Sequence, residues 1–396
     1  MAATRPTVLQ IIPELDTGGA ELSTIEIAAA LVKAGARALV LSEGGRMSNR
    51  LKAAGGELIQ FPAAAKNPAT LLLNAQRIAA IARREGVDLI HARSRAPAWS
   101  ALTAARRLKL PFITTYHGAY NERSRAKNFY NSVMARGDTV IANSRYTADL
   151  IKSRYGTAES RIRVIYRGVD VDGFNPDAVS AARIAALRQC WRVSDDTRVV
   201  LHAARLTAWK GQRQIIDAAA RMKDALGGVV FIMAGDAQGR DGYVTELEHA
   251  IAANGLQDSV RLVGHVDDMP AAFAAAHVAF VGSIEPEAFG RAGAEAQAIG
   301  CPVISTNIGA PPETVKAPPR VAAAERTGWL VAPSDLAAYE QSLTEALALT
   351  RAERASMAKR ARQNILDNFT TAAMQRQTLE VYDKHLGTDL ARRFSA

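Results

Sequence analysis

The segment 287–303 reads EAFGRAGAEAQAIGCPV, and it is the most decisive stretch for the fold. Two carboxylates, Glu287 and Glu295, stand eight residues apart across a predicted loop-to-helix junction. Gly290 lets the backbone approach a ligand closely, and a helix is expected to begin just after it. Because a helix N-terminus presents N–H groups and partial positive charge, it suits a phosphate. The spacing favours hydroxyl-binding carboxylates on either side of that phosphate, as a nucleotide sugar requires.

Paired carboxylates also occur in glycosidases, where they work as acid and base across one bond. That chemistry needs the two groups roughly 5–9.5 Å apart. Here Glu287 precedes the predicted helix and Glu295 lies in its second turn, with the phosphate site between them. The arrangement therefore favours two carboxylates that bind opposite ends of one donor molecule over two that flank a single scissile bond.

Working outward, short apolar strands alternate with Ala-rich helical stretches along most of the chain. This rhythm predicts parallel sheets covered by helices. The expected strands are Thr7–Ile12, Arg37–Leu41, Val87–His91, Phe112–Tyr116, Thr139–Ala142, Arg198–Ala203, Val229–Ala234, Val260–Val263, Val278–Val281 and Val303–Ser305.

The rhythm pauses at 168–176, where Gly, Asp, Asn and Pro cluster, and then restarts. The sequence therefore predicts two Rossmann-like doubly wound α/β domains facing a cleft. Residues 1–175 would form the first domain and 176–370 the second. A C-terminal helix in 371–396 could cross back to the first domain. Ligands of such sheets bind beyond the carboxyl ends of the strands.

Cations and glycines follow several of these predicted strands. Arg205 and Lys210 stand after a strand and just before a helix. The planar guanidinium of arginine and the mobile ammonium of lysine both suit a pyrophosphate at such a place. His117 ends another strand and could donate to a sugar hydroxyl or a developing charge. Weaker candidates, each also consistent with a simple turn, are Gly18, Gly19, Gly235 and His265.

Composition fits a soluble globular protein, with 48% apolar and 22% charged residues. No secretory signal is evident, and the longest apolar run, Ala271–Gly282, is too short to span a bilayer. We expect a cytoplasmic protein in which Cys190 and Cys301 are reduced packing residues.

Charge is unevenly spread. Residues 1–175 hold 25 Lys/Arg against 14 Asp/Glu, a net of +11, whereas 176–396 hold 24 against 25, a net of −1. A basic half indicates an anionic partner or simply charge for solubility. No nucleic-acid-binding module is recognisable. Cations and aromatics mix around the first-domain candidates, which suits an anionic lipid surface or acceptor: Arg93, Arg95, Arg123, Arg125 and Lys127.

Taken together, these motifs resemble the retaining glycosyltransferases of the GT-B fold known as family 4. The resemblance runs over nearly the whole chain and rests on the order of its elements. These are Gly18-Gly19-Ala20-Glu21, His117-Gly118, Asn143-Ser144, Gly168-Val169-Asp170, Arg205 with Lys210-Gly211, Ala234-Gly235-Asp236, Glu287-x7-Glu295, Gly309 to Val315 with Glu313, and Thr327 to Val331.

The resemblance implies that the first domain, 1–175, binds the acceptor and that the second, 176–370, binds the nucleotide-sugar donor. It also implies a role for each matching residue. Arg205 and Lys210 would bind the donor diphosphate, and Glu287 the hydroxyls of the transferred sugar. Glu295 would hold the ribose. The backbone of Phe289, Gly290 and Arg291 would approach the phosphates, Gly18 and Gly19 would meet the donor from the other domain, and His117 would lie near the reacting sugar.

Such enzymes generally need no metal and no cofactor beyond the nucleotide-sugar co-substrate. The DxD-like Asp170-Val171-Asp172 is accordingly interpreted as a hinge turn and not as a metal site. The chain departs from the family at Arg167, where Asn is usual, at Ala288, and at Arg291 and Gly293. These departures bear on the donor sugar.

The expected activity is hexose transfer, with retention, from a UDP- or GDP-linked sugar to an anionic, lipid-linked acceptor such as lipopolysaccharide core. The enzyme would act on the cytoplasmic face of the inner membrane. Two alternatives stay open: a nucleotide-sugar epimerase on the same fold, and a non-catalytic nucleotide-sugar-binding protein.

Overall fold

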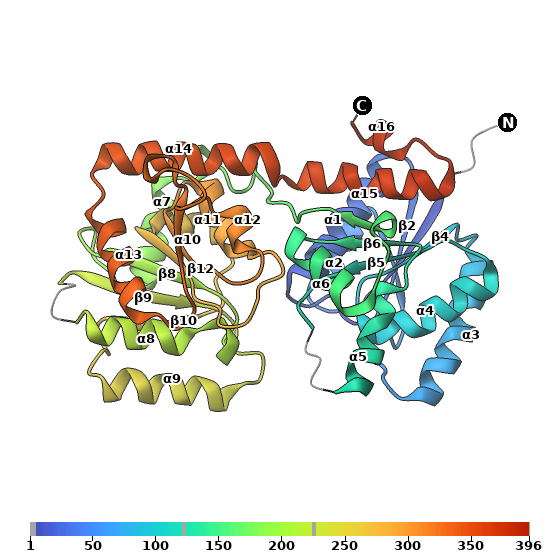
Figure 1. The fold of residues 1–396 in the computed structure, drawn as a ribbon, viewed down its shortest axis with the longest axis horizontal. Helices are drawn as coiled ribbons and strands as arrows, with labels where there is room; N and C mark the ends of the chain where they lie inside the picture. Colours follow the sequence, from blue (N-terminus) through green and yellow to red (C-terminus); the bar gives the residue numbers. More distant parts are fainter. Residues whose placement is uncertain (1–4, 121–123, 224–226, 396) are drawn as a thin grey trace. The chain divides into compact units, whose positions relative to one another are not determined.

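A computed structural model describes residues 5–120, 124–223 and 227–395 (Figure 1). The chain divides into two compact units. The first runs to Gly168 and takes up the chain again at Thr371, and the second comprises Val169–Thr370. None of the described helices is both long enough and apolar enough to cross a membrane.

The first unit is built on a parallel sheet. Its described strands are β1 (Thr7–Ile11), β2 (Arg37–Ser42), β3 (Glu57–Gln60), β4 (Leu89–Ala92), β5 (Phe112–Tyr116), β6 (Thr139–Ala142) and β7 (Ile162–Val164). They lie in the order β3-β2-β1-β4-β5-β6-β7. The order reverses between β1 and β4, where Ile11 lies opposite both Leu41 and Ala92. The carboxyl ends of β1 and β4 therefore flank the switch point of this sheet.

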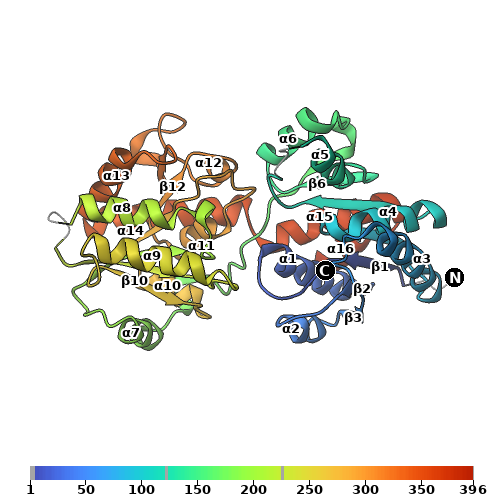
Figure 2. The same cartoon turned by 90° about the horizontal axis from the view of Figure 1, so that it is seen from below.

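Helices cover both faces of the first sheet (Figure 2). One face is covered by α1 (Gly19–Lys33), α2 (Ser48–Ala53), α15 (Thr371–Leu386) and α16 (Leu390–Ser395). The other is covered by α3 (Pro68–Arg84), α4 (Arg95–Leu108) and α6 (Arg145–Tyr155), with the short α5 (Arg125–Asn131) preceding the 3₁₀ turn η1 (Ser132–Ala135). Small alanines line the buried faces of α3 and α4, which lets these helices pack closely on the sheet and on each other.

The second unit repeats this plan. Its described strands are β8 (Arg198–Ala203), β9 (Val229–Ala234), β10 (Val260–Gly264), β11 (Val278–Val281), β12 (Val303–Thr306) and β13 (Gly328–Val331). They lie in the order β10-β9-β8-β11-β12-β13, again parallel throughout. The switch point lies between β8 and β11.

One face of the second sheet carries α8 (Gln212–Arg221), α9 (Asp241–Ala253) and α13 (Leu336–Ala348). The other carries α7 (Ala181–Cys190), α10 (Met269–Ala275) and α11 (Arg291–Ile299). The remaining helical segments are α12 (Pro311–Thr314), α14 (Arg351–Asn368), η2 (Glu159–Arg161), η3 (Pro176–Ala178), η4 (Ala208–Lys210) and η5 (Ala323–Glu325).

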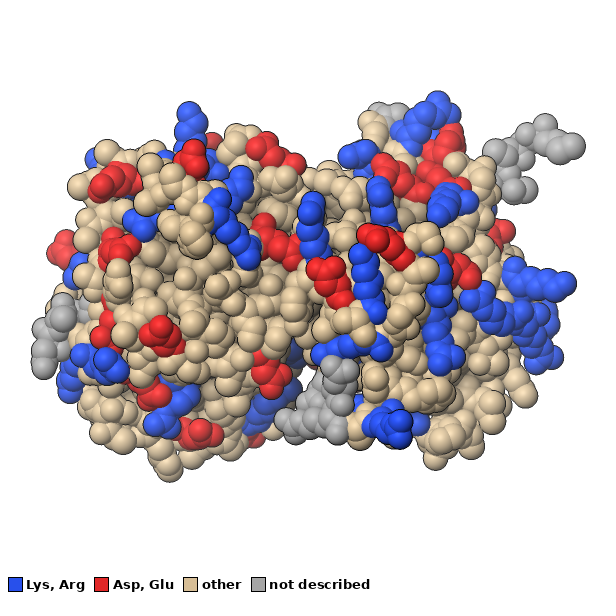
Figure 3. Space-filling view, in the orientation of Figure 1, with Lys and Arg blue, Asp and Glu red and all other residues tan. Residues whose placement is uncertain are grey.

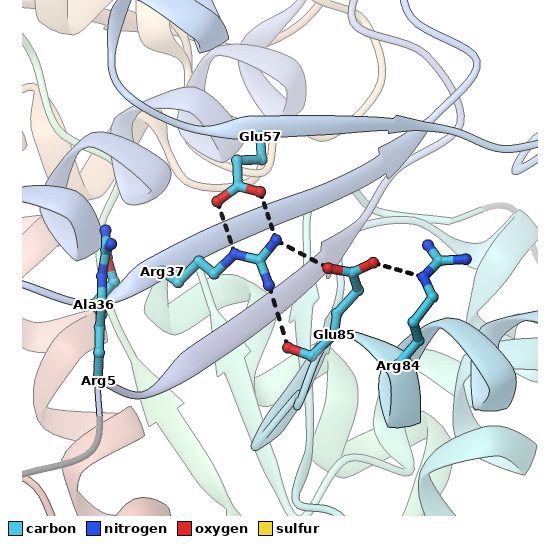
Figure 4. A network of polar contacts seen from close by, with 6 residues as sticks. All are labelled: Arg5, Ala36, Arg37, Glu57, Arg84 and Glu85. Carbon is cyan, nitrogen blue, oxygen red and sulfur yellow. Dashed lines mark hydrogen bonds and ion pairs between the residues drawn. The ribbon is translucent and has the colours of Figure 1, made fainter.

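An ion-pair network ties the edge strand β3 to its neighbours at the amino ends of the strands (Figure 4). Arg37 opens β2 and donates to Glu57 on β3, at 2.6 Å from Nη2, and to Glu85 after α3, at 2.9 Å. Hydrogen bonds from Arg37 lower the pKa of Glu57, and those from Arg84 and then Arg37 lower the pKa of Glu85. This network lies at the end of the sheet opposite the loops in which ligands bind.

The structure contains three strands that the sequence pattern did not predict: β3, β7 and β13. All three are edge strands of their sheets. β3 and β7 are three or four residues long and partly exposed, so they lack the continuous apolar run of the central strands. Residues 169–175, assigned from the sequence to the first domain, lie in the second unit. There the Val169 N–H donates to the Phe369 carbonyl, and Phe174 packs on Phe273.

Candidate functional site

The two loops that flank the switch point of the second sheet meet at a buried ion pair. Lys210 ends the loop after β8, and Glu287 follows β11. Lys210 Nζ donates to Glu287 Oε1, and the Ser283 hydroxyl donates to the same oxygen at 2.5 Å. Glu287 is 8% exposed. One carboxylate oxygen is thus fixed by two donors, which sets the direction of the other.

Close backbone contact holds this pair in place. Gly211 has a φ of 79°, and a Cβ there would overlap the carbonyl oxygen of Gly282. The Ile284 N–H donates to the Trp209 carbonyl at 2.8 Å. Under the pair, burial lowers the pKa of His202 to about 4, and its Nδ1 lies 2.8 Å from the carbonyl oxygen of Phe280. His202 is therefore neutral and donates to that carbonyl.

The second carboxylate is held separately. Gly290 has a φ of 82° and is the N-cap of α11, as the opening segment predicts. Glu295 lies in the second turn of this helix and accepts from Arg291 Nε at 2.8 Å, with both side chains about 15% exposed. Glu287 and Glu295 thus each have their own cation, one on either side of the helix N-terminus. The sequence assigned only the Arg291 backbone to the site; its side chain also fixes Glu295.

The other donor-side candidates differ in how firmly they are fixed. Arg205 is exposed, and its Nη1 donates to Gln238 at 3.3 Å, while its carbonyl accepts from Gln212 at 2.8 Å. At Gly235 a Cβ would overlap the Ala204 carbonyl oxygen, so this glycine lets the ends of β8 and β9 approach. His265 is half exposed, and its Nε2 lies 3.1 Å from Asp267 Oδ1.

In the first unit, His117 and the glycine pair lie at the carboxyl ends of strands. Gly18 is the N-cap of α1 with a φ of 144°, and Gly19 is the first residue of that helix. Arg167 Nη2 lies 2.7 Å from His117 Nδ1. Because a guanidinium can only donate, Nδ1 must accept, and the neutral ring then carries its proton on Nε2. Burial first, then Arg167, keeps the pKa of His117 well below 6.5.

The residues predicted to form a basic surface differ in how far they are exposed. Arg93 is 3% exposed and cannot contribute to a membrane face. Arg95 is half-buried over the Tyr120 ring, at 4.1 Å, and donates to Asn131. Arg125 and Lys127 are exposed on α5, and Arg123 lies outside the described residues. Burial thus excludes Arg93 from the predicted surface, which the sequence alone did not indicate.

Much of the positive charge lies elsewhere on the first unit. Lys and Arg side chains gather where α3 and α4 reach the edge of their lobe (Figure 3). Independently of that view, four arginines occupy the last turns of α3 and α4, where cations complement the helix dipole: Arg83, Arg84, Arg106 and Arg107. Part of the charge excess therefore has a structural explanation.

The segment Asp170-Val171-Asp172 forms a turn in which Asp170 Oδ1 accepts from the backbone N–H groups of Asp172 and Gly173. Within the described ranges, no group of three or more His, Cys, Asp or Glu side chains has the geometry of a metal site. Sequence reasoning overlooked two supporting residues, Ser283 and Arg167. Ser283 has no motif signal, whereas Arg167 was visible as a departure from the family pattern.

This chain belongs to the group 1 glycosyltransferases. Residues 17–172 match the family model described as Glycosyltransferase Family 4, and residues 184–364 match Glycosyl transferases group 1. A glycosyltransferase from Rickettsia africae, solved as a crystal structure, is 32% identical, with a TM-score of 0.87 and coverage of 98% of this chain and 100% of that one.

Two further relatives carry information on ligands. Anabaena HepE, solved in complex with UDP-glucose, is 26% identical with a TM-score of 0.83, over 96% of this chain and 99% of that one. The D-inositol 3-phosphate glycosyltransferase of Xylanimonas cellulosilytica is 30% identical over 57% of each chain. The chain spans little more than half the length of such curated relatives.

Proposed function

We propose that this protein transfers a hexose from a UDP- or GDP-linked sugar, with retention of configuration, to a hydroxyl of an anionic, lipid-linked glycan. The observation that carries the proposal is the Lys210–Glu287–Ser283 cluster at a sheet switch point, beside the N-terminus of α11. The UDP-glucose bound to HepE supports a nucleotide sugar as the donor.

In this mechanism the donor diphosphate replaces solvent at Arg205, Lys210 and the N–H groups of α11. Negative charge grows on the diphosphate as the glycosidic bond breaks, and these fixed positive groups stabilise it. The Oε2 of Glu287 would accept from a sugar hydroxyl and Glu295 from the ribose. The departing phosphate oxygen would take the acceptor proton on the same face, so no covalent nucleophile and no metal are required.

His117 would contribute from the first unit. Its Nε2 is buried and has no hydrogen-bond partner among the described residues. Since Arg167 places the proton on that nitrogen, His117 is a neutral donor suited to a sugar hydroxyl. A neutral donor adds no positive charge that would oppose the oxocarbenium-like sugar.

The acceptor that we favour is a lipopolysaccharide core or a related envelope glycolipid, reached on the cytoplasmic face of the inner membrane. Support comes from α5, where exposed Arg125 and Lys127 accompany Phe129, which is 61% exposed. An apolar side chain among cations suits an anionic lipid surface. The relative named for D-inositol 3-phosphate is likewise named for a phosphorylated molecule.

The test is incubation with a panel of uridine and guanosine diphosphate sugars, with and without membrane lipid extract, followed by mass spectrometry. We expect one sugar to be added to one lipid, with EDTA leaving the rate unchanged. Lys210→Ala should lower transfer by about 10²–10³-fold, through loss of one charge-stabilising group. Lys359→Ala, at an exposed position of α14, is the matched control and should leave it unaltered.

Each alternative has its own result. Conversion of the donor without any acceptor would establish the epimerase. Tight donor binding without any product would establish a binding protein. Near-normal transfer by Lys210→Ala would show that the diphosphate is held elsewhere.

A further inference from the structure

One arginine of the first unit is buried without a counter-ion. Arg93 follows β4 and is 3% exposed. Its Nε is buried without a hydrogen-bond partner, and no ion pair to its guanidinium occurs among the described residues. A buried, unpaired charge is costly to a folded protein, so its presence calls for a compensating role.

The position of Arg93 is a ligand-binding position by topology. Its N–H donates to the Ile11 carbonyl, so Arg93 lies where β1 and β4 end, at the switch point of the first sheet. His117 lies at the end of the adjacent β5, and both Arg93 and Arg167 act on its charge state. Two arginines and a neutral histidine thus share one end of this sheet.

Among the described residues, the carboxylate that acts on Arg93 does so from a distance and forms no ion pair with it. Burial lowers the pKa of Arg93 to about 10, and Tyr382 and Glu26 only partly oppose that effect. Glu21 is turned toward Gly18, where a Cβ would lie 2.5 Å from its Oε2. An oxyanion bound at Arg93 would supply the missing countercharge, and a guanidinium can hold it with two parallel hydrogen bonds.

We propose that Arg93 binds an anionic group, a phosphate or phosphate ester, on the acceptor beside its attacking hydroxyl. This inference deepens the proposed function and rests on it only for the identification of the ligand as the acceptor. Since Arg93 lies close enough to His117 to influence it, an anion bound at Arg93 would lie on the same end of the sheet as the residue proposed to contact the reacting sugar. The acceptor is therefore a hydroxyl compound with a phosphate close to the hydroxyl that is glycosylated.

The first experiment measures binding of inorganic phosphate by calorimetry and by the thermal shift it causes. It uses the full chain carrying Arg205→Ala and Lys210→Ala, which removes the phosphate-binding cations of the second unit. In this background we expect phosphate to bind and to raise the melting temperature. Adding Arg93→Met should weaken binding at least tenfold, whereas Arg93→Lys should retain part of it.

A second readout separates a binding role from a structural one. Without phosphate, Arg93→Met should melt at the same temperature as its parent or higher, because it removes an uncompensated buried charge. Equal phosphate binding with and without Arg93→Met would overturn the proposal, as would the absence of binding in the parent. Marked destabilisation of Arg93→Met, with phosphate binding unaffected, would assign Arg93 to structure alone.

In the otherwise wild-type protein, Arg93→Met should raise the KM for the acceptor at least tenfold and leave the Kd for the donor unchanged. Glycerol 3-phosphate and phosphatidylglycerol vesicles, compared as competitors of the acceptor, distinguish a soluble from a lipid-borne phosphate. Competition by either of them supports the site if it is lost in Arg93→Met. If no donor and acceptor pair gives transfer, the proposed function fails while the phosphate measurements still decide on Arg93.

Discussion

Three candidate side chains of this site are each held by a partner that sets their direction. Lys210 and Ser283 hold Glu287, Arg291 holds Glu295, and Arg167 holds His117. In every pair one partner is a cation, which can only donate. The cation occupies one acceptor atom of the side chain and thereby fixes the direction in which the other atom points. Such preorganisation lowers the cost of binding and of charge development.

At the residue scale, the sharpest prediction concerns Arg167→Met. The variant should lower kcat/KM by about tenfold, for the loss of one hydrogen bond worth about 1.4 kcal/mol. Nδ1 of His117 would no longer be occupied, so the ring could carry its proton on either nitrogen. One of the causes that lowers the His117 pKa is also removed, so that pKa should move up toward 6.5. Nitrogen NMR of the histidines, titrated with pH, measures both effects.

Arg163→Met supplies the control for this variant, because Arg163 is an exposed arginine on the nearby β7. It should alter neither the rate nor the histidine spectrum. A purely structural role for Arg167 predicts a lower melting temperature with the His117 tautomer unchanged. That pattern would contradict the positioning role.

At the scale of elements, the central strands were predictable because each is a continuous apolar run buried on both faces. The edge strands β3 and β7 were not, because their partners are on one side only and the sequence there is mixed. The α11 junction was predictable from Gly290, whose left-handed φ requires a glycine-like residue. Arg167 lies 50 residues from His117, and spacing along the chain carries no signal for such a contact. Ser283 lies only four residues before Glu287, but a lone serine there matches no motif.

The element best suited to reach a lipid surface is α5. Trp99 of α4 stacks on Phe129 with the ring centres 5.1 Å apart, and Arg136 lies over both rings. Phe129 is therefore exposed yet held rigidly. Burying it in a bilayer interface should contribute about 1.5 kcal/mol, so Phe129→Ala should weaken binding to anionic vesicles about tenfold. Co-sedimentation with phosphatidylglycerol vesicles measures this, and added salt should weaken binding by screening the cations.

Leu366→Ala is the matched control, since Leu366 is an exposed apolar residue of the second unit. Its vesicle binding should equal that of the wild type. Equal binding by Phe129→Ala, or binding that does not respond to salt, would remove α5 from the membrane face. The transferase reaction with a soluble acceptor should be unaffected by either substitution.

At the scale of the whole molecule, the C-terminal segment is part of the first unit although it follows the second in sequence. Buried residues of α15 and α16 complete one face of the first core: Met374, Leu379, Val381, Tyr382 and Leu390. The Tyr382 hydroxyl lies 2.7 Å from His91 Nδ1, and His385 Nε2 lies 2.8 Å from Thr139 Oγ1. The first core thus depends on residues that follow the second unit in the sequence.

A chain that ends at residue 370 should therefore lose the first unit and keep the second. Removing a large buried apolar side chain costs about 2–5 kcal/mol, so the loss of the five named above exceeds the usual net stability of about 5–15 kcal/mol or comes close to it. Limited proteolysis should degrade the first unit and leave a resistant fragment near 169–370. Trp99, the tryptophan of the first unit, should report unfolding by fluorescence.

Tyr382→Phe in the full chain is the control: it loses one hydrogen bond, costs about 1–3 kcal/mol and should stay folded. If the truncated chain protects both units equally, α15 and α16 only cover a first core that is already sufficient; if both are digested together, the second unit depends on the first.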